Sequence, residues 1–453
     1  MSTEAPVFSK AAIRRLIFPL IVEQFLAVTV GMADTIMVTG SGELAVSGIS
    51  LVDTLNILLI NVFTALATGG AVVASHYLGE GKRERACTAC NQLILVVFSL
   101  SFSLAVLSVV FNYPILHGIY GDLDPQVMGY ARTYYYLTAC SFPFLGVYNG
   151  AAAICRSMGN SKISMKVSVL MNGMNVVGNA ILIYGFHMSV EGAGISTLVS
   201  RITAAVIMMI IVRDQKLELH IDPRLRLGFS PDIIKNILRV GIPVSVENGL
   251  FQGGKLMVAG LVSSFGTVSI AANAVANTIA SFQCIAGTAI GLAMITVVGQ
   301  AVGAGRYQEA KRYAVRLCLL VICAHMAVCI PMLFFLKPII GFYNVSPETM
   351  QLAWQVSMLH GICCMFIWPW SFTLPNALRA ADDVRFAMCI TMLSMFLCRV
   401  AMSWVLGKYF GLGLLGVWIA MILDWVVRGV IYSWRLAAGG WLKNHKARLA
   451  AQG

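Results

Sequence analysis

Charged residues are scarce in this chain of 453 residues. Asp, Glu, Lys and Arg together make up 11% of it, whereas hydrophobic residues make up 58%. Ordinary soluble domains carry about 25% charged residues. Acidic residues are scarcer than basic ones, with 20 Asp and Glu against 32 Lys and Arg. The composition excludes a soluble globular domain and is typical of a polytopic membrane protein.

The motifs of several enzyme classes are also absent from the sequence. It contains no HExxH zinc-protease motif, no GxSxG nucleophile elbow and no Walker A motif. Its seven histidines are dispersed, so converging catalytic groups at one membrane depth are not indicated. We therefore predict that the chain is not an enzyme, holds no cofactor and is not driven directly by ATP.

Long apolar runs predict twelve membrane-spanning helices, each long enough to cross a hydrocarbon core. The expected fold is therefore an all-α integral membrane protein. The first run is too long for a cleavable signal peptide and lacks an A-x-A exit. The spans are expected at about 13–38, 47–76, 88–111, 128–153, 164–185, 192–212, 240–263, 269–298, 314–336, 350–377, 386–406 and 414–434.

Basic residues alternate across the predicted membrane. Most of the 32 Lys and Arg residues lie at the N-terminal flank, at every second junction and in the segment 213–239. By the positive-inside rule, this pattern predicts that both termini are cytoplasmic in a plasma (inner) membrane. The basic excess thus indicates anionic lipid of the bilayer, and not nucleic acid, as its partner.

The second half of the chain repeats the first at an offset of about 224 residues. Each repeat contains six predicted spans, an even number, so the two halves are expected to be related by a pseudo-twofold axis along the membrane normal. We predict an N-terminal lobe at 1–212, a cytoplasmic linker at 213–239 and a C-terminal lobe at 240–453. The matching positions include Pro19 with Pro243, Glu23 with Glu247, Asp53 with Asn277, and Arg156 with Arg379.

Two acids interrupt the first apolar helix. Glu23 and Asp34 are eleven positions apart, which places them on nearly the same helix face at about 100° per residue. A carboxylate inside a membrane segment costs several kcal/mol unless it is paired or hydrated. This face is therefore expected to border a cavity, and the alternative is that each acid is held in a structural pair. Pro19 removes a backbone hydrogen bond and permits a kink in the same helix.

Several short motifs occur in register with the repeat. They are Pro19 with Gly31-Met-Ala-Asp34, Gly79-Glu-Gly81 with Gly303-Ala-Gly305, and Arg156-Ser-Met-Gly159 with Leu378-Arg379-Ala-Ala-Asp382. In the order and spacing of these motifs, over nearly the whole chain, the sequence resembles the multidrug and toxic compound extrusion (MATE) family of antiporters. The resemblance implies two six-helix lobes around a central cleft, and a monomer that exports amphipathic, cationic small molecules in exchange for protons or sodium ions.

The resemblance also implies a cation site in the N-terminal lobe. The matching residues are Asp34, Asn175, Asn179 and Thr197. Asn175 and Asn179 are four positions apart and share one helix face. Hard oxygen ligands of this kind suit an alkali cation. Some relatives have Asp in place of Asn179, and the missing charge favours a proton over sodium. The alternative for the two asparagines is hydrogen bonding between helices in lipid.

The second lobe departs from this pattern, because Val258 stands where the repeat would place a counterpart of Asp34. Glu247 remains, with Lys255 and Arg399 also inside spans, so it is either a functional acid or the partner of one of these cations. Asp424 and Arg428 are four positions apart and are expected to form a structural pair. Five residues of this lobe could offer carboxylate, amide or thioether groups to a substrate cleft, and the alternative is that they serve ordinary packing. They are Glu247, Asn248, Gln252, Met257 and Gln283.

A second transport function is an alternative to drug export. Flippases for lipid-linked glycan precursors share the repeat of this superfamily. Such flippases usually line their cleft with several basic residues, and only Lys255 and Arg399 qualify here.

Overall fold

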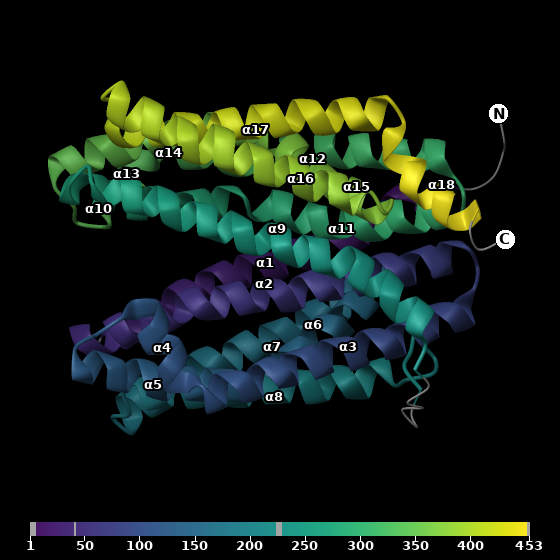
Figure 1. Ribbon diagram of the computed structural model, residues 1–453, viewed down its shortest axis with the longest axis horizontal. Coiled ribbons are helices and arrows are strands. Elements are labelled where there is room, and N and C mark those ends of the chain that lie inside the picture. The colour runs from purple at the N-terminus through teal and green to yellow at the C-terminus, as the bar shows by residue number, and fades with distance from the viewer. Residues whose placement is uncertain (1–5, 40–41, 223–228, 451–453) are drawn as a thin grey trace. The chain divides into compact units, whose positions relative to one another are not determined.

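The computed structural model describes residues 6–39, 42–222 and 229–450, and all regular secondary structure in these ranges is helical (Figure 1). The chain divides into two compact units, Lys10–Ser245 and Val246–Gly453, and the second unit also includes the chain before Lys10. Val7 and Phe8 join this second unit because their backbone N–H groups donate to Glu309 and Tyr313, each at 2.9 Å. Within each unit the long helices run roughly parallel or antiparallel to one another.

The N-terminal unit is built from long apolar helices joined by short turns. Helix α1 packs along α7, α2 packs against α3, α5 and α6, and α8 packs against α5, α6 and α7. The elements are α1 (Lys10–Thr39), α2 (Glu43–Gly79), α3 (Arg83–Val110), α4 (Asn112–Tyr120), α5 (Pro125–Cys140), α6 (Phe142–Ser157), α7 (Ser161–Asn179), the π-helical turn η1 (Ala180–Gly185) and α8 (Val190–Val212).

The C-terminal unit has the same kind of layout. Helix α10 packs on α14, α11 lies between α12 and α15, and α17 contacts the π-helical segments η2, η3 and η4. The elements are α9 (Pro231–Ser263), α10 (Thr267–Gln283), α11 (Ile285–Gly303), α12 (Tyr307–Phe334), α13 (Leu336–Gly341), α14 (Pro347–Phe366), η2 (Pro369–Thr373), α15 (Leu374–Ala380), α16 (Val384–Ser394), η3 (Met395–Ala401), η4 (Trp404–Tyr409), α17 (Gly413–Ala437), η5 (Gly440–Leu442) and α18 (Lys443–Ala450).

The described helices account for the predicted spans. Nine are long and apolar enough to cross a membrane, and the number rises to eleven when two bent pairs each count as one span. The bent pairs are α5 with α6, at 44°, and α14 with the segment Pro369–Ala380, at 63°. The twelfth predicted span, 240–263, falls on α9, which is not among these candidate spans and contains Glu247, Gln252 and Lys255.

The predicted lobe boundaries differ from the boundary between the two compact units. The contact-based division falls between Ser245 and Val246, inside α9, so this helix begins in one unit and ends in the other. Within the predicted linker 213–239, residues 223–228, including Arg224 and Arg226, lie outside the described ranges. The boundaries at 212 and 240 stay a prediction.

Glycines permit the closest helix packing in the N-terminal unit. A Cβ atom on Gly69 of α2 would lie 2.5 Å from the carbonyl oxygen of Ile237 in α9, and one on Gly70 would lie 2.4 Å from Leu93 of α3. Small residues of this kind let helix backbones approach closely where no hydrophobic force drives association. They therefore fix α2 between α3 and the start of α9.

Candidate functional site

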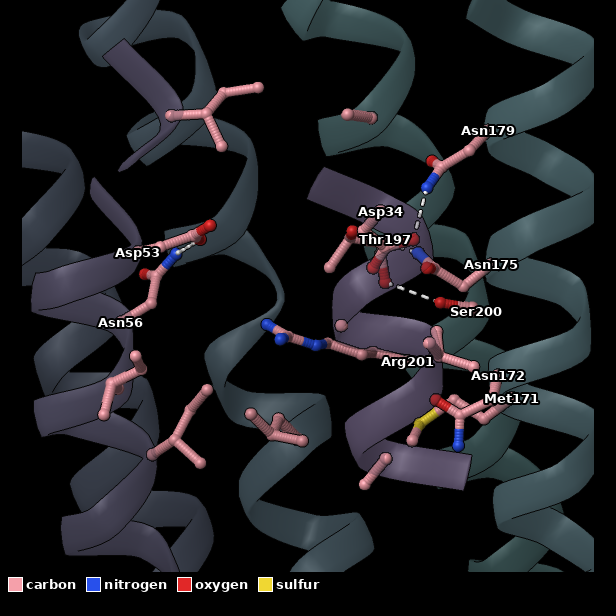
Figure 2. Close-up of a pocket in the computed structure, with 18 of the residues that line it drawn as sticks. Asp34, Asp53, Asn56, Met171, Asn172, Asn175, Asn179, Thr197, Ser200 and Arg201 are labelled. Atoms are coloured by element: carbon pink, nitrogen blue, oxygen red, sulfur yellow. Dashed lines mark hydrogen bonds between the residues drawn. The ribbon is translucent and has the colours of Figure 1, made fainter. Parts of the chain in front are cut away.

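A cavity of about 670 Å³ lies inside the N-terminal unit (Figure 2). Helices α1, α2, α5, α6, α7 and α8 all contribute to its wall. Its volume falls in the range of about 300–1,000 Å³ that is usual for small-molecule sites. The polar lining of this cavity is unusual for a membrane helix bundle, because it includes two aspartates and an arginine: Asp34, Asp53 and Arg201.

Asp34 stands on α1 and meets polar groups of α7. Asn179 Nδ2 donates a hydrogen bond to Asp34 Oδ1 at 2.8 Å. When the amide nitrogen of Asn175 faces Asp34, it reaches both carboxylate oxygens, at 2.9 and 3.0 Å, and its oxygen accepts from Thr197 Oγ1 at 3.1 Å. This orientation satisfies all three residues, whereas the opposite one would place an amide oxygen against a carboxylate. The four residues that the family resemblance implied therefore lie together.

The local fold explains this convergence. Asn175 and Asn179 lie one turn apart in the last part of α7, which packs along α1. Ser196 Oγ of α8 donates to the backbone oxygen of Asn175 at 2.8 Å and fixes that turn. Helix α7 then continues as the π-helical turn η1, directly after Asn179. Such π-turns are frequent at functional sites because they reposition side chains within a helix.

One acceptor of the cluster has no partner. Among the described residues, Asn179 Oδ1 is buried and receives no hydrogen bond. An orphaned buried oxygen costs free energy unless a donor or a cation reaches it. Since it belongs to the amide that binds Asp34, it can accept from a protonated Asp34 after the amide rotates.

The opposite side of the cavity holds a second charged group of residues. Asp53 of α2 accepts a hydrogen bond from Asn56 at 3.5 Å. Arg201 of α8, one turn after Thr197, donates from Nη1 to Ser141 Oγ at 2.7 Å. Figure 2 shows its guanidinium pointing away from α8 into the space that separates Asp34 from Asp53.

Glu23 belongs to a structural pair as well as to the cavity wall. Its Oε1 lies 3.6 Å from Arg156 Nη1 of α6, and its Oε2 accepts from Ser164 Oγ of α7 at 3.0 Å. Of the two alternatives for Glu23, the structure favours the pair. Asp34, on the same helix, has no cationic side chain among the described residues within 4.0 Å.

Glu247, the repeat counterpart of Glu23, has a different partner from the two predicted. Arg379 Nη2 donates to Glu247 Oε1 at 2.7 Å, and Thr391 Oγ1 donates to the same oxygen at 2.7 Å. The prediction that Lys255 or Arg399 pairs with Glu247 was wrong. Lys255 lies over the ring of Phe251, with its nitrogen 5.9 Å from the ring centroid, and Arg399 approaches Asp424.

The other sequence predictions for the second lobe have mixed outcomes. Arg428 Nη2 donates to Asp424 Oδ2 at 2.7 Å, which confirms that pair. Gln283 is fully buried in the C-terminal unit, with its amide oxygen against His360. Asn248 and Gln252 are half-buried and Met257 is exposed. A substrate role for these four residues and for Glu247 stays a prediction.

Comparison with known proteins identifies the family. The MatE family model matches residues 19–181 and again residues 243–405, one match in each repeat. The chain is a member of the MATE family. Nearly three-quarters of its length lies inside the two matches, so membership covers both lobes and confirms the resemblance seen in the sequence.

Full-length relatives and solved structures agree with this assignment. This MATE protein is 24% identical over 438 residues to the uncharacterized transporter YisQ of Bacillus subtilis, with 95% of each chain covered. It is 27% identical to a probable multidrug resistance protein NorM of Thermotoga maritima, with 97% of this chain and 95% of the relative covered. A multidrug resistance MATE transporter solved in an outward-facing conformation superposes with a TM-score of 0.89 at 19% identity and covers 96% of each chain. The predicted all-α, multi-pass membrane fold with two lobes is thereby confirmed.

Two residues of the cavity escaped the sequence analysis as members of a site. Arg201 falls inside the span predicted at 192–212 with no role assigned to it, and Asp53 stands only as the repeat counterpart of Asn277. The available signal was their charge, because an ionisable residue within a membrane span usually lines a cavity or a pathway. What the sequence did not provide was the convergence of α2 and α8 on one cavity.

Proposed function

We propose that this MATE protein is a secondary active exporter of amphipathic, cationic small molecules, driven by a cation that binds at Asp34. The observation that carries the proposal is the hydrogen-bonded cluster of Asp34 with Asn175 and Asn179 in the wall of a drug-sized cavity. Several full-length relatives are named as probable multidrug resistance proteins, which supports drug export over the flippase alternative.

The cluster provides a physical route from ion binding to helix packing. In its ionised form Asp34 accepts three amide hydrogen bonds that hold α1 against α7. When a proton or sodium ion neutralises it, those amide donors lose a charged acceptor, and the orphaned Asn179 oxygen gains a donor or a cation. The two forms of the site therefore favour different positions of α1, whose Pro19 permits bending. A ligand shifts such an equilibrium only through its different affinity for the two states.

The ligand set favours the proton over sodium. A sodium site is strengthened by several charged or strongly polar oxygens, and this cluster has one carboxylate, two amides and a hydroxyl. Asp53 and Asp34 both line the cavity, but Arg201 lies between them and opposes a second cation. We accordingly expect protonation and deprotonation of Asp34 to be the coupling step.

The proposal includes the location and orientation of the protein. We infer that it lies in the plasma membrane with both termini in the cytoplasm, because the basic residues gather on one set of junctions. Anionic lipid is the partner of these residues. One chain contains the whole cation cluster and the cavity, so a monomer is sufficient for transport.

Reconstituted protein tests the coupling directly. Purified protein in liposomes loaded with a fluorescent cationic dye is exposed first to a pH gradient alone and then to a sodium gradient alone. We expect the pH gradient to drive dye movement in the wild type, and the Asp34→Asn variant to lose this response while expression and dye binding persist.

The matched control is Glu247→Gln, which removes an acid from the equivalent repeat without touching the cavity. This variant is expected to retain a larger share of gradient-driven transport than Asp34→Asn. Equal transport by wild type and Asp34→Asn under both gradients would place the coupling site elsewhere.

A further inference from the structure

Arg201 is the only basic residue that lines the cavity among the described residues, and the proposed cation exchange does not use it. It lies in α8, inside a predicted span, where a guanidinium is expensive unless it is paired or hydrated. Its side chain is half-buried, lines the cavity and points into it (Figure 2). It therefore faces any molecule that enters the cavity.

Four other arginines within or near the spans have a carboxylate partner. Each approaches an aspartate or glutamate oxygen to 4.0 Å or less, namely Arg156, Arg379, Arg399 and Arg428. For Arg201, no carboxylate oxygen of the described residues lies within that distance, and its hydrogen bond goes to the neutral hydroxyl of Ser141. Asp34 and Asp53 act on it only at longer range. Arg201 thus retains donors that are free to bind an anionic group.

The cavity presents both signs of charge within the reach of one small molecule. A monocation can pair with Asp53 or with the ionised form of Asp34, but it leaves Arg201 without an anion. Arg–carboxylate contacts are among the strongest hydrogen bonds in proteins, because both partners are charged and the fork geometry matches. Tyr134, Tyr148 and Met171 supply the apolar and adaptable part of the wall. A ligand with an amine at one end, a carboxylate at the other and an apolar body would satisfy every one of these groups.

We propose that the N-terminal cavity binds zwitterionic amphiphiles, with Arg201 holding the carboxylate of the ligand and Asp53 or Asp34 its amine. The inference rests on the proposed function and deepens it, because it names the substrate class of the same cavity. It also assigns Arg201 as a specificity-determining residue. Export of a zwitterion is compatible with proton coupling when Asp53 holds the amine, since Asp34 is then free to exchange its proton.

A pair of dyes that differ by one group provides the test. Rhodamine 19 has a free carboxylate, and rhodamine 6G is its ethyl ester with the same cationic xanthene. Binding of each dye to the purified full-length protein in detergent is measured by fluorescence polarisation, with no ion gradient present. The wild type is expected to bind the acid at least as tightly as the ester. In Arg201→Gln the acid should bind about ten- to a hundredfold more weakly, as expected for loss of a hydrogen bond between charged groups, whereas the ester should change less than about threefold.

Two further variants separate recognition of the carboxylate from general damage. Arg201→Lys keeps the charge and should restore part of the preference for the acid. Asn172→Ala removes a neutral polar group from the same wall and should affect both dyes equally.

Three results would overturn the proposal. They are wild-type protein that clearly prefers the ester, an Arg201→Gln variant that weakens both dyes equally, and an Arg201→Gln variant that weakens neither. The wild-type comparison decides the matter even if Arg201→Gln does not fold. Because no gradient is applied, a failure here is distinct from a failure of Asp34 coupling.

Discussion

The Glu247–Arg379 pair yields a quantitative prediction about stability. Glu247 is only 4% exposed and its Oε1 accepts two hydrogen bonds of 2.7 Å, one from Arg379 and one from Thr391. Its Oε2 has no partner among the described residues. Replacing Arg379 by Gln would leave a buried carboxylate with one firm neutral donor and no opposing charge.

The expected cost follows from the burial of the pair. Removing one partner of a buried ion pair costs about 3–5 kcal/mol, because the remaining charge is left uncompensated. The Arg379 side chain is 15% exposed, so some water reaches it, and we expect a loss near the lower end, about 3 kcal/mol. The double variant Glu247→Gln/Arg379→Gln removes both charges and should recover most of that loss, since neutral replacements of buried pairs are often tolerated.

Reversible unfolding in mixed detergent and SDS micelles measures these differences. The four proteins of the cycle are the wild type, the two single variants and the double variant, all at one pH and one salt concentration. A coupling free energy near zero, with the two single losses simply adding, would refute the assignment of this pair as a stabilising contact.

The first repeat contains a matched comparison. Arg156 approaches Glu23 only to 3.6 Å, so Arg156→Gln is expected to cost less than Arg379→Gln, about 1–2 kcal/mol. Equal losses of stability in Arg156→Gln and Arg379→Gln would show that the shorter contact of Arg379 does not determine the cost.

Two other predictions concern topology and packing. On a background without the native cysteines, single cysteines at Lys82 and near the C-terminus should be labelled from the cytoplasmic side and one at Asp122 from outside; labelling of positions 82 and 122 from the same side would contradict the twelve-span topology. Gly69→Ala should lower the midpoint of thermal unfolding because its Cβ would lie 2.5 Å from the Ile237 carbonyl oxygen, whereas Gly173→Ala, with no neighbouring atom within 4 Å, should leave the midpoint unchanged or raise it. Equal effects of the two substitutions would show that contact at Gly69 does not limit the packing of α2 and α9.

The positions of the spans could be predicted because a bilayer demands a long apolar run for each of them. What apolar length does not reveal is where a span bends. The span predicted at 128–153 is two helices that meet at Ser141, and the one predicted at 350–377 is broken near Pro369. Proline at positions 143 and 369 was the local signal for these breaks, since it removes a backbone hydrogen bond from the helix. The π-helical turn after Asn179 has no comparable signal in the sequence.

In the candidate site, too, contacts within one helix could be predicted from the sequence, whereas contacts between distant helices could not. Asn175 and Asn179 share a face because they are one turn apart, and that could be predicted from spacing alone. The partner of Glu23 lies 133 residues away and that of Glu247 lies 132 residues away, so neither follows from helix geometry. The repeat nevertheless contained the answer. A glutamate and an arginine recur at nearly the same offset, and a structural pair present in both lobes would produce that pattern.

The repeat also separates the charges that build the fold from those that give the cavity its chemistry. The first group recurs: Glu23 and Arg156 form a contact in one unit, and Glu247 and Arg379 form the equivalent contact in the other. The other three charged residues of the cavity have no charged counterpart. Val258 and Asn277 match Asp34 and Asp53 at the offset of 224, and Leu423 matches Arg201 at the offset of 222 that relates Gly194 to Gly416. A membrane-embedded charge that serves packing is needed in both lobes of a duplicated scaffold, whereas one that serves an ion or a ligand is needed only where that ion or ligand binds. On this reasoning Arg201 belongs with Asp34 and not with the structural arginines, and an Arg201→Gln variant should change the ligand preference more than the stability, the opposite of Arg379→Gln.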